Sequence, residues 1–214
     1  MDNFKGLVQE LSHLQSDMQA SLGIEVPEEK IHLFLFEKKA TYQAYLKRYF
    51  PTVPSRPALY INDRQRPGML FACQGVDFEV DVRHEATHAI LHANLREVPL
   101  WVDEGLAEYY EMPRDKRSDG NPHLQTVRQL LRQNELPRLD ELESLRDISE
   151  MRREHYRDAW AWMHFCLHGS REAYTELVNL LKDAKNEEDL SPLSLRLRSR
   201  IPDLEAKLVR HFRP

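Results

Sequence analysis

The stretch His84-Glu85-Ala86-Thr87-His88 carries the side chains best suited to metal chemistry. Successive residues of an α-helix turn by about 100°, so two histidines four positions apart project from the same side of a helix, where both can bind one metal ion. Glu85 follows the first histidine directly and is close enough to exchange a proton with a water molecule at the metal. The pentapeptide therefore predicts a zinc site on a helix, with Glu85 as its base.

The residues around this motif favour a helix. Between Asp77 and Ala93 the sequence contains neither glycine nor proline. Apolar residues recur at helical spacing on the side away from the two histidines; they are Val82, Ala86, Ala89, Ile90 and Ala93. We expect that side to pack inward while the histidines face a cleft. A helix that merely carries two histidines is the alternative, and the chain's 10 histidines keep it open.

A second segment, residues 101–111, is rich in carboxylates and begins with tryptophan. As a helix it would place Glu104, Glu108 and Glu111 on one face. Most such faces are simply solvated. Two histidines, however, leave a zinc site one protein ligand short, and a carboxylate from a second helix can supply it. Both interpretations of this acidic face stay open at this point.

Length and composition indicate a globular protein. The 214 residues, of which 41% are hydrophobic, suit one domain or one domain built as two lobes around a cleft. The net charge of −5, with both signs mixed along the chain, argues against nucleic-acid binding, which depends on Lys and Arg against phosphate. Cys73 and Cys166 are too few for a disulfide framework, so we expect two small buried hydrophobic residues.

The sequence also predicts a protein without a membrane span. No window approaches the ~20 apolar residues that a spanning helix needs. The start, Met1-Asp2-Asn3-Phe4-Lys5, lacks the basic and apolar regions of a signal peptide. As given, the chain is expected to be cytoplasmic, and a secreted or periplasmic protein if a signal segment has been removed. The sequence does not indicate an oligomeric state.

Hydrophobic periodicity and chain breakers predict an α+β fold. A helix from Phe4 to near Gly23 comes first; then follow a strand at 31–36, a helix at 41–50, a turn at 62–68 between strands at 58–61 and 69–74, and the motif helix. Further helices are expected at 123–134, 156–168, 170–184 and 202–212, with a mobile surface loop at 112–122 and an ambiguous segment at 192–201 that favours a helix. A small mixed β-sheet with the active-site helix would thus form an N-terminal lobe, 1–95, and a mostly helical C-terminal lobe would span 96–214.

The two motifs together resemble those of the gluzincins, the thermolysin-like clan of zinc peptidases. The segment from Trp101 to Tyr109 looks especially like the short bacterial peptidase MA-like, or minigluzincin, members. The metzincin pattern is absent, because Leu91 and Asn94 stand where it requires Gly and a third His. The resemblance is strong at the two motifs and covers about residues 30–180. It implies a single zincin-like catalytic domain over 1–214, with a cleft between its lobes and one catalytic Zn²⁺.

The resemblance also implies roles for individual residues. His84, His88 and Glu104 would bind zinc, and Glu108 would accept a hydrogen bond from His84 and fix its tautomer. Tyr156 would stabilise the oxyanion, although the residues alone make it a core position. Substitutes for these roles are Asp103 as third ligand and Tyr109, Tyr110, His155 or His164 in place of Tyr156. Two departures from thermolysin are a shorter gap between the motifs and Glu108 where thermolysin has Asp.

The activity implied by the resemblance is zinc-dependent hydrolysis of peptide bonds in a peptide or protein substrate. The aminopeptidase signature Gly-x-Met-Glu-Asn is missing from the strand at 69–74, so we expect an endopeptidase. That strand would line the cleft and pair with an extended substrate. One alternative is a catalytically latent gluzincin-like protein that keeps zinc and binds a protein partner, against which the intact Glu85 argues; another is a structural domain with a chance motif. His92 lies one turn beyond His88 and could join the site or stabilise the end of the helix.

Overall fold

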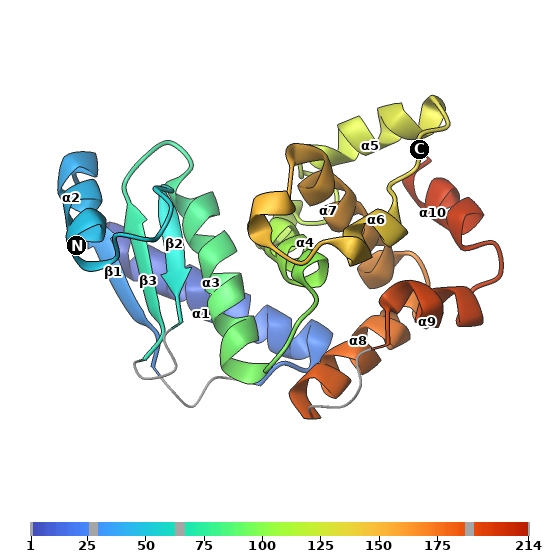
Figure 1. Cartoon of the computed structure of the whole chain (residues 1–214), viewed down its shortest axis with the longest axis horizontal. Coiled ribbons are helices and arrows are strands. Elements are labelled where there is room, and N and C mark those ends of the chain that lie inside the picture. The colour runs from blue at the N-terminus through green and yellow to red at the C-terminus, as the bar shows by residue number, and fades with distance from the viewer. Residues whose placement is uncertain (1, 26–29, 63–66, 187–190, 214) are drawn as a thin grey trace. The chain divides into compact units, whose positions relative to one another are not determined.

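The chain folds into two compact units, Met1–Asn94 and Leu95–Pro214. The structure is a computed structural model, and it describes residues 2–25, 30–62, 67–186 and 191–213 (Figure 1). Helices dominate, and the first unit also contains a small mixed sheet. The expected α+β class is confirmed.

The first unit contains three helices and three strands. They are α1 (Asp2–Leu22), β1 (His32–Phe36), α2 (Lys39–Tyr49), β2 (Ala58–Ile61), β3 (Met69–Cys73) and α3 (Phe78–Asn94). Each begins and ends within about two residues of its predicted position, because the helices have a clear hydrophobic period and the strands are apolar runs between chain breakers. Gly23 directly follows the last residue of α1, and its φ of 69° is left-handed, a conformation that glycine adopts without steric strain. The turn expected at 62–68 lies partly outside the described residues.

Strand β3 is the central strand of the sheet. It runs parallel to β1, with His32 opposite Met69, and antiparallel to β2, with Tyr60 opposite Leu70. Both of its edges are therefore hydrogen-bonded within the sheet. The expectation that residues 69–74 pair with an extended substrate is wrong, because their backbone groups already serve two neighbouring strands.

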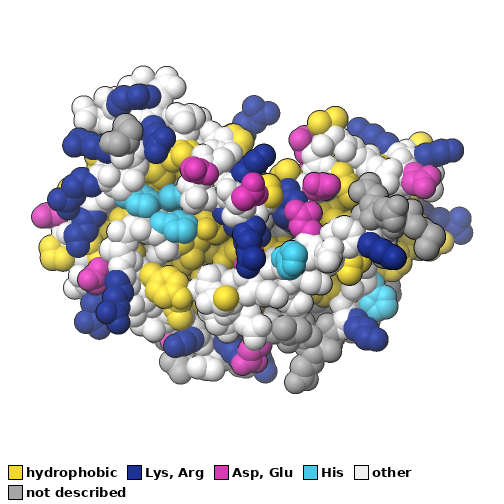
Figure 2. Space-filling model, turned by 180° about the vertical axis from the view of Figure 1, so that it is seen from behind, with side chains coloured by type: hydrophobic (Ala, Val, Ile, Leu, Met, Phe, Trp, Pro, Cys, Tyr) yellow, Lys and Arg dark blue, Asp and Glu magenta, His cyan; other side chains and the backbone are white. Residues whose placement is uncertain are grey.

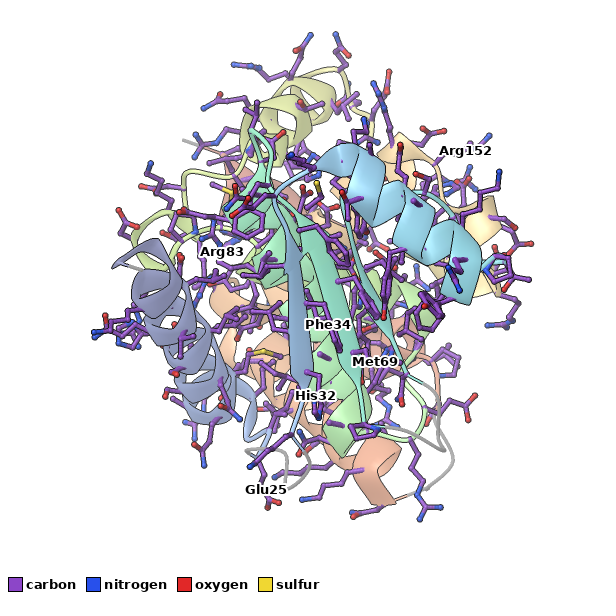
Figure 3. The ribbon with its side chains drawn as sticks, turned by 90° about the vertical axis from the view of Figure 1, so that its left-hand side faces the viewer. Glu25, His32, Phe34, Met69, Arg83 and Arg152 are labelled. Carbon is purple, nitrogen blue, oxygen red and sulfur yellow. The ribbon has the colours of Figure 1, made fainter. Side chains whose placement is uncertain are left out.

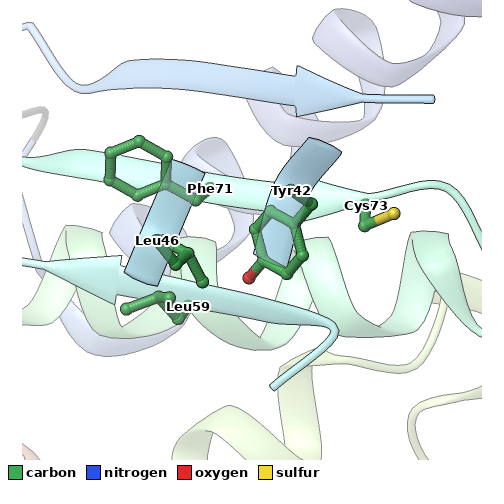
Figure 4. Close-up of a cluster of buried hydrophobic side chains, with 5 residues drawn as sticks. All are labelled: Tyr42, Leu46, Leu59, Phe71 and Cys73. Carbon is green, nitrogen blue, oxygen red and sulfur yellow. The ribbon is translucent and has the colours of Figure 1, made fainter. Parts of the chain in front are cut away.

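Helices α1 and α2 lie on opposite sides of this sheet, as seen in Figure 3 from the edge formed by β1. Helix α2 covers its side through one buried cluster, formed by Tyr42, Leu46, Leu59, Phe71 and Cys73 (Figure 4). Helix α3 packs against β2, β3 and α1. The buried Arg83 of α3 forms an ion pair with Glu10 of α1, which ties these two helices together. Both cysteines of the chain are buried and free, as expected.

The regular elements in the described part of the second unit are all helical. Its helices are α4 (Leu100–Tyr110), α5 (His123–Arg132), α6 (Leu139–Ser144), α7 (Arg153–His168), α8 (Arg171–Asn186), α9 (Leu193–Arg200) and α10 (Leu204–Phe212), with short 3₁₀ turns η1 (Arg114–Lys116) and η2 (Ile148–Glu150). The ambiguous segment at 192–201 is the helix α9. Sequence reasoning missed α6 and η2, because elements this short do not complete a readable hydrophobic period.

Helix α7 forms the centre of this unit. It packs against α4, α5, α6, α8 and α10, and its side chains Trp160, Met163 and Phe165 are fully buried. Its contact with α4 is close at Gly105, where an added Cβ would lie 2.7 Å from Cγ of Met163 and 2.8 Å from the carbonyl oxygen of Ala159. The glycine of the second motif is therefore required by helix packing.

Three histidines connect α7 with its surroundings; His164 is buried, His211 is half-buried and His168 is exposed. Nε2 of His164 donates to the carbonyl oxygen of Ser118 at 2.7 Å, which leaves Nδ1 to accept a hydrogen bond from Nε2 of His211 at 2.8 Å. The hydroxyl of Tyr109 on α4 bonds to Nε2 of His168 at 2.8 Å. Burial lowers the pKa of His164 and of His211 to about 4, so both rings are neutral at pH 7.

The surface carries charges of both signs. Basic and acidic side chains are interspersed over the face drawn in Figure 2. Within the part of the chain that the structure describes, no helix combines the length and apolarity needed to cross a bilayer.

We predict that Gly105→Ala destabilises the protein by about 1 to 3 kcal/mol, because the new methyl group would overlap the backbone of α7. Gly6→Ala is the matched control: it is the same substitution in α1, where nothing lies within 4 Å of the added Cβ. The control should stabilise the helix by up to about 1 kcal/mol. Urea denaturation followed by far-UV circular dichroism measures both, and equal effects of the two variants would contradict the packing explanation.

We also predict that the free energy of unfolding of the second unit falls as the pH drops from about 6.5 to about 4. In this window unfolded histidines with an ordinary pKa of about 6.5 take up protons, whereas the native His164 and His211 stay neutral, so protonation favours the unfolded chain. All three tryptophans, Trp101, Trp160 and Trp162, lie in this unit. Urea titrations followed by tryptophan fluorescence therefore report it.

A histidine substitution separates this effect from the titration of carboxylates. His211→Gln keeps a hydrogen-bond donor for His164 but does not titrate, so the loss of stability with falling pH should become shallower. His13→Gln, at an exposed position of α1, should leave it unchanged. An unaltered pH dependence in His211→Gln would show that the histidine pair is not its source.

Candidate metal centre

The two histidines of the first motif lie on α3 in a geometry that suits one metal ion. One nitrogen of His84 and one nitrogen of His88 lie within 4.8 Å of each other. The ring centroids are 4.9 Å apart, and the helix is continuous through both residues. His88 is buried and His84 is half-buried. Imidazole nitrogens are favoured ligands of zinc, and at this spacing two of them can bind one ion.

His92 follows on the next turn of the same helix. It is exposed, and one of its nitrogens lies within 4.8 Å of a nitrogen of His88. Its ring lies 5.9 Å from that of Tyr60 on β2. Helix α3 therefore offers two overlapping histidine pairs that share His88. The other side of the helix packs inward as expected except for Ala93, which is exposed because α3 ends there.

Glu85 is held by the backbone of the sheet. Its side chain is buried, and Oε2 accepts a hydrogen bond of 2.6 Å from the backbone N–H of Tyr60. This contact forms because α3 packs against β2, an edge strand whose outer amides are not used by the sheet. Sequence reasoning missed Tyr60, because only the strand order shows that residue 60 lies at an edge. The contact fixes the carboxylate of the expected base at a defined place.

In the second unit, Glu104 lies on α4. It is only 5% exposed, so the interpretation of this face as a solvated acidic stripe is wrong at this residue. Asp103 is similarly buried, at 8%. A carboxylate is stable inside a protein only when a cation or hydrogen-bond donors surround it. Both residues therefore have the burial expected of a metal ligand. Glu104 also occupies the motif position at which the third ligand is expected.

Glu108 is held by the segment that follows α4. Its Oε2 lies 3.0 Å from Nε2 of His123. The amide group of the buried Asn121 donates to the carbonyl oxygen of Glu108 at 3.1 Å, and its oxygen accepts from the backbone N–H of His123 at 2.8 Å. Asn121 thus fixes both partners of the pair. The expected role of Glu108 toward His84 would use the second carboxylate oxygen.

The segment 112–122 is anchored, contrary to the expectation of a mobile surface loop. The buried guanidinium of Arg117 donates to the carbonyl oxygen of Met112 at 3.1 Å and lies 4.9 Å from the ring centroid of Tyr110. Asn121 and the carbonyl oxygen of Ser118 provide further contacts to α4 and α7. The charged composition of the segment suggested exposure, but the side chains of Arg117 and Asn121 are buried and hold the segment in place.

Tyr156 lies on the side of α7 that packs against α4. It precedes Ala159 and Met163, which contact Gly105, by three and seven positions, and these spacings share one helix face. Its side chain is partly exposed. Two of its substitutes have structural bonds of their own: Tyr109 bonds to His168, and His164 bonds to Ser118 and His211. A third, His155, is buried beside Arg152 and Glu141.

Comparison with known proteins places the chain in one family. A search of curated proteins gave no match. The family model described as "Protein of unknown function (DUF1570)" matches residues 80–188, which is more than half of the chain and includes both motifs. The chain therefore belongs to the DUF1570 family.

Proposed function

We propose that the chain is a zinc-dependent metallopeptidase that cleaves internal peptide bonds. The observation that carries the proposal lies on α3, where two histidine nitrogens lie within 4.8 Å of each other beside a buried carboxylate that a backbone amide holds in place. A helix that only needed to pack would not require two histidines and a buried carboxylate in adjacent positions. A base with a fixed position next to two metal ligands is what metal-assisted hydrolysis requires.

His84, His88 and Glu104 would hold the metal ion. Two imidazoles and one carboxylate form a donor set that suits zinc, and three protein ligands leave a coordination position for water or substrate. When bound, zinc would lower the pKa of a water molecule and polarise the carbonyl group of the substrate. The burial of Glu104 supports its choice as third ligand.

The residues of the chain would then carry the proton and stabilise charge. Glu85 accepts a proton from water and later delivers it to the leaving amine. Tyr156 donates a hydrogen bond to the oxyanion that develops on the substrate carbonyl. Glu108 accepts a hydrogen bond from His84 and fixes the orientation of that ring.

Strand β2 takes the place of residues 69–74 as the strand that we expect to pair with substrate. It is an edge strand, it contacts α3, and its Tyr60 bonds to Glu85. An extended peptide that adds to this edge would lie beside the base. An endopeptidase is favoured because the aminopeptidase signature is absent from the sequence.

A second ligand set competes with the first. It would consist of His88, His92 and Asp103, and it would share with the proposed set only His88. It would place the ion one helical turn further along α3, away from Glu85. The two sets make opposite predictions for single substitutions.

We predict that Glu85→Gln abolishes peptide hydrolysis, by about 10²-fold or more, and leaves the zinc content unchanged, because an amide cannot accept the proton. Glu79→Gln is the matched control at an exposed position of the same helix, and it should retain activity. Zinc-loaded protein is incubated with an unbiased peptide mixture, and new internal cuts are identified by mass spectrometry. Undiminished cleavage by Glu85→Gln would rule out Glu85 as the base.

We further predict that His84→Ala and Glu104→Gln each lose most of the bound zinc, whereas His92→Ala and Asp103→Asn retain it. Each removed ligand lowers the number of protein donors below the three that catalytic sites use. Zinc per chain is measured by mass spectrometry of the metal after dialysis against a weak chelator. The reverse pattern would assign the ion to the second ligand set, and full zinc retention in all four variants would overturn the metal centre on α3.

A further inference from the structure

A cavity of about 270 Å³ lies within the first unit, where β3 ends and α3 begins. Its walls come from α2, from the residues before β2 and from the turn between β3 and α3. The volume is slightly below the ~300 Å³ at which typical small-molecule sites start. The cavity therefore suits a compact ligand.

Charged residues of both signs line this cavity. Lys39 and Arg56 carry positive charge, and Asp77 and Asp81 carry negative charge. The positive end of the helix dipole ordinarily stabilises the negative charge of two carboxylates at the start of a helix. Here burial raises the pKa of Asp81, and the neighbouring Asp77 raises it further. A cationic group in the cavity would offset both effects.

Tyr42 supplies an independent observation that points to a ligand. Its side chain is 2% exposed and lines the cavity. Within the described residues its hydroxyl has no hydrogen-bond partner. Burial raises the pKa of this phenol, so it keeps its proton and remains a donor. Buried hydroxyls in folded proteins normally have a partner, and an unpartnered one requires an explanation.

We propose that this cavity binds a small zwitterion, namely a free α-amino acid. Asp77 and Asp81 accept hydrogen bonds from its ammonium group, and Lys39 and Arg56 pair with its carboxylate. The Tyr42 hydroxyl gains the partner that it lacks among the residues that the structure describes. A divalent cation fits less well, because the two basic side chains on the wall would repel it.

The ligand class is tested by isothermal titration calorimetry of the full-length protein, freed of metal by chelator, with L-alanine as the probe. Alanine should bind once per chain. N-acetylalanine, which lacks the ammonium, and alanine amide, which lacks the carboxylate, should each bind about tenfold more weakly or not at all.

Equal binding of alanine and N-acetylalanine would overturn the proposal. So would saturable binding of Ca²⁺ with none of alanine. Retained binding of alanine amide would identify a peptide amino terminus rather than a free amino acid, and would overturn the zwitterion.

Two variants assign the binding to the named groups. Asp81→Asn and Tyr42→Phe should each weaken alanine binding by about tenfold. Glu79→Gln changes an exposed residue in the first turn of α3 and should leave alanine binding unchanged. Tyr42→Phe also removes an unpartnered polar atom, so the ligand-free protein should be at least as stable as wild type in urea. A loss of ligand-free stability with unchanged alanine binding would make the hydroxyl structural and overturn its role. Peptide cleavage is not part of this readout, so the failure of either proposal is visible separately.

Discussion

The pairing of β3 with a strand on each side is the constraint on which the first unit depends. A strand held at both edges cannot shift its register without breaking two ladders of hydrogen bonds. Only residues 74–77 separate this strand from α3, so the sheet also fixes where the helix starts. The positions of His84, Glu85 and His88 on that helix follow from it. The same short turn forms a wall of the amino-acid cavity, so both proposed sites depend on one junction.

In the second unit, the acidic motif is fixed by close packing rather than by hydrogen bonds along a sheet. Gly105 lets α4 approach the backbone of α7, and Asn121 bonds to the backbone of both members of the Glu108–His123 pair. A carboxylate on a helix gains a defined direction only when its neighbours prevent the helix from rotating. The motif residues between the glutamates are thus as much a part of the arrangement as the glutamates themselves.

The sequence was most informative where one local period determines the structure. The helix at 78–94 and the face shared by its histidines follow from 3.6 residues per turn, and the strands follow from short apolar runs between breakers. Properties that depend on distant residues could not be read in this way. The central place of β3, the bond between Tyr60 and Glu85 and the anchoring of 112–122 by Arg117 all require knowledge of which segments meet. Local composition pointed the wrong way for the last of these, because charged residues usually indicate exposure.

The hydrogen bond from Tyr60 to Glu85 has an entropic consequence. A free glutamate side chain samples many rotamers, and restricting it to one costs up to about 2 kcal/mol. Here a backbone amide of the sheet selects the rotamer, and that amide has no side-chain torsions of its own to lose. The conformational freedom of this carboxylate is therefore given up once, when the unit folds, and is not lost again each time the group acts.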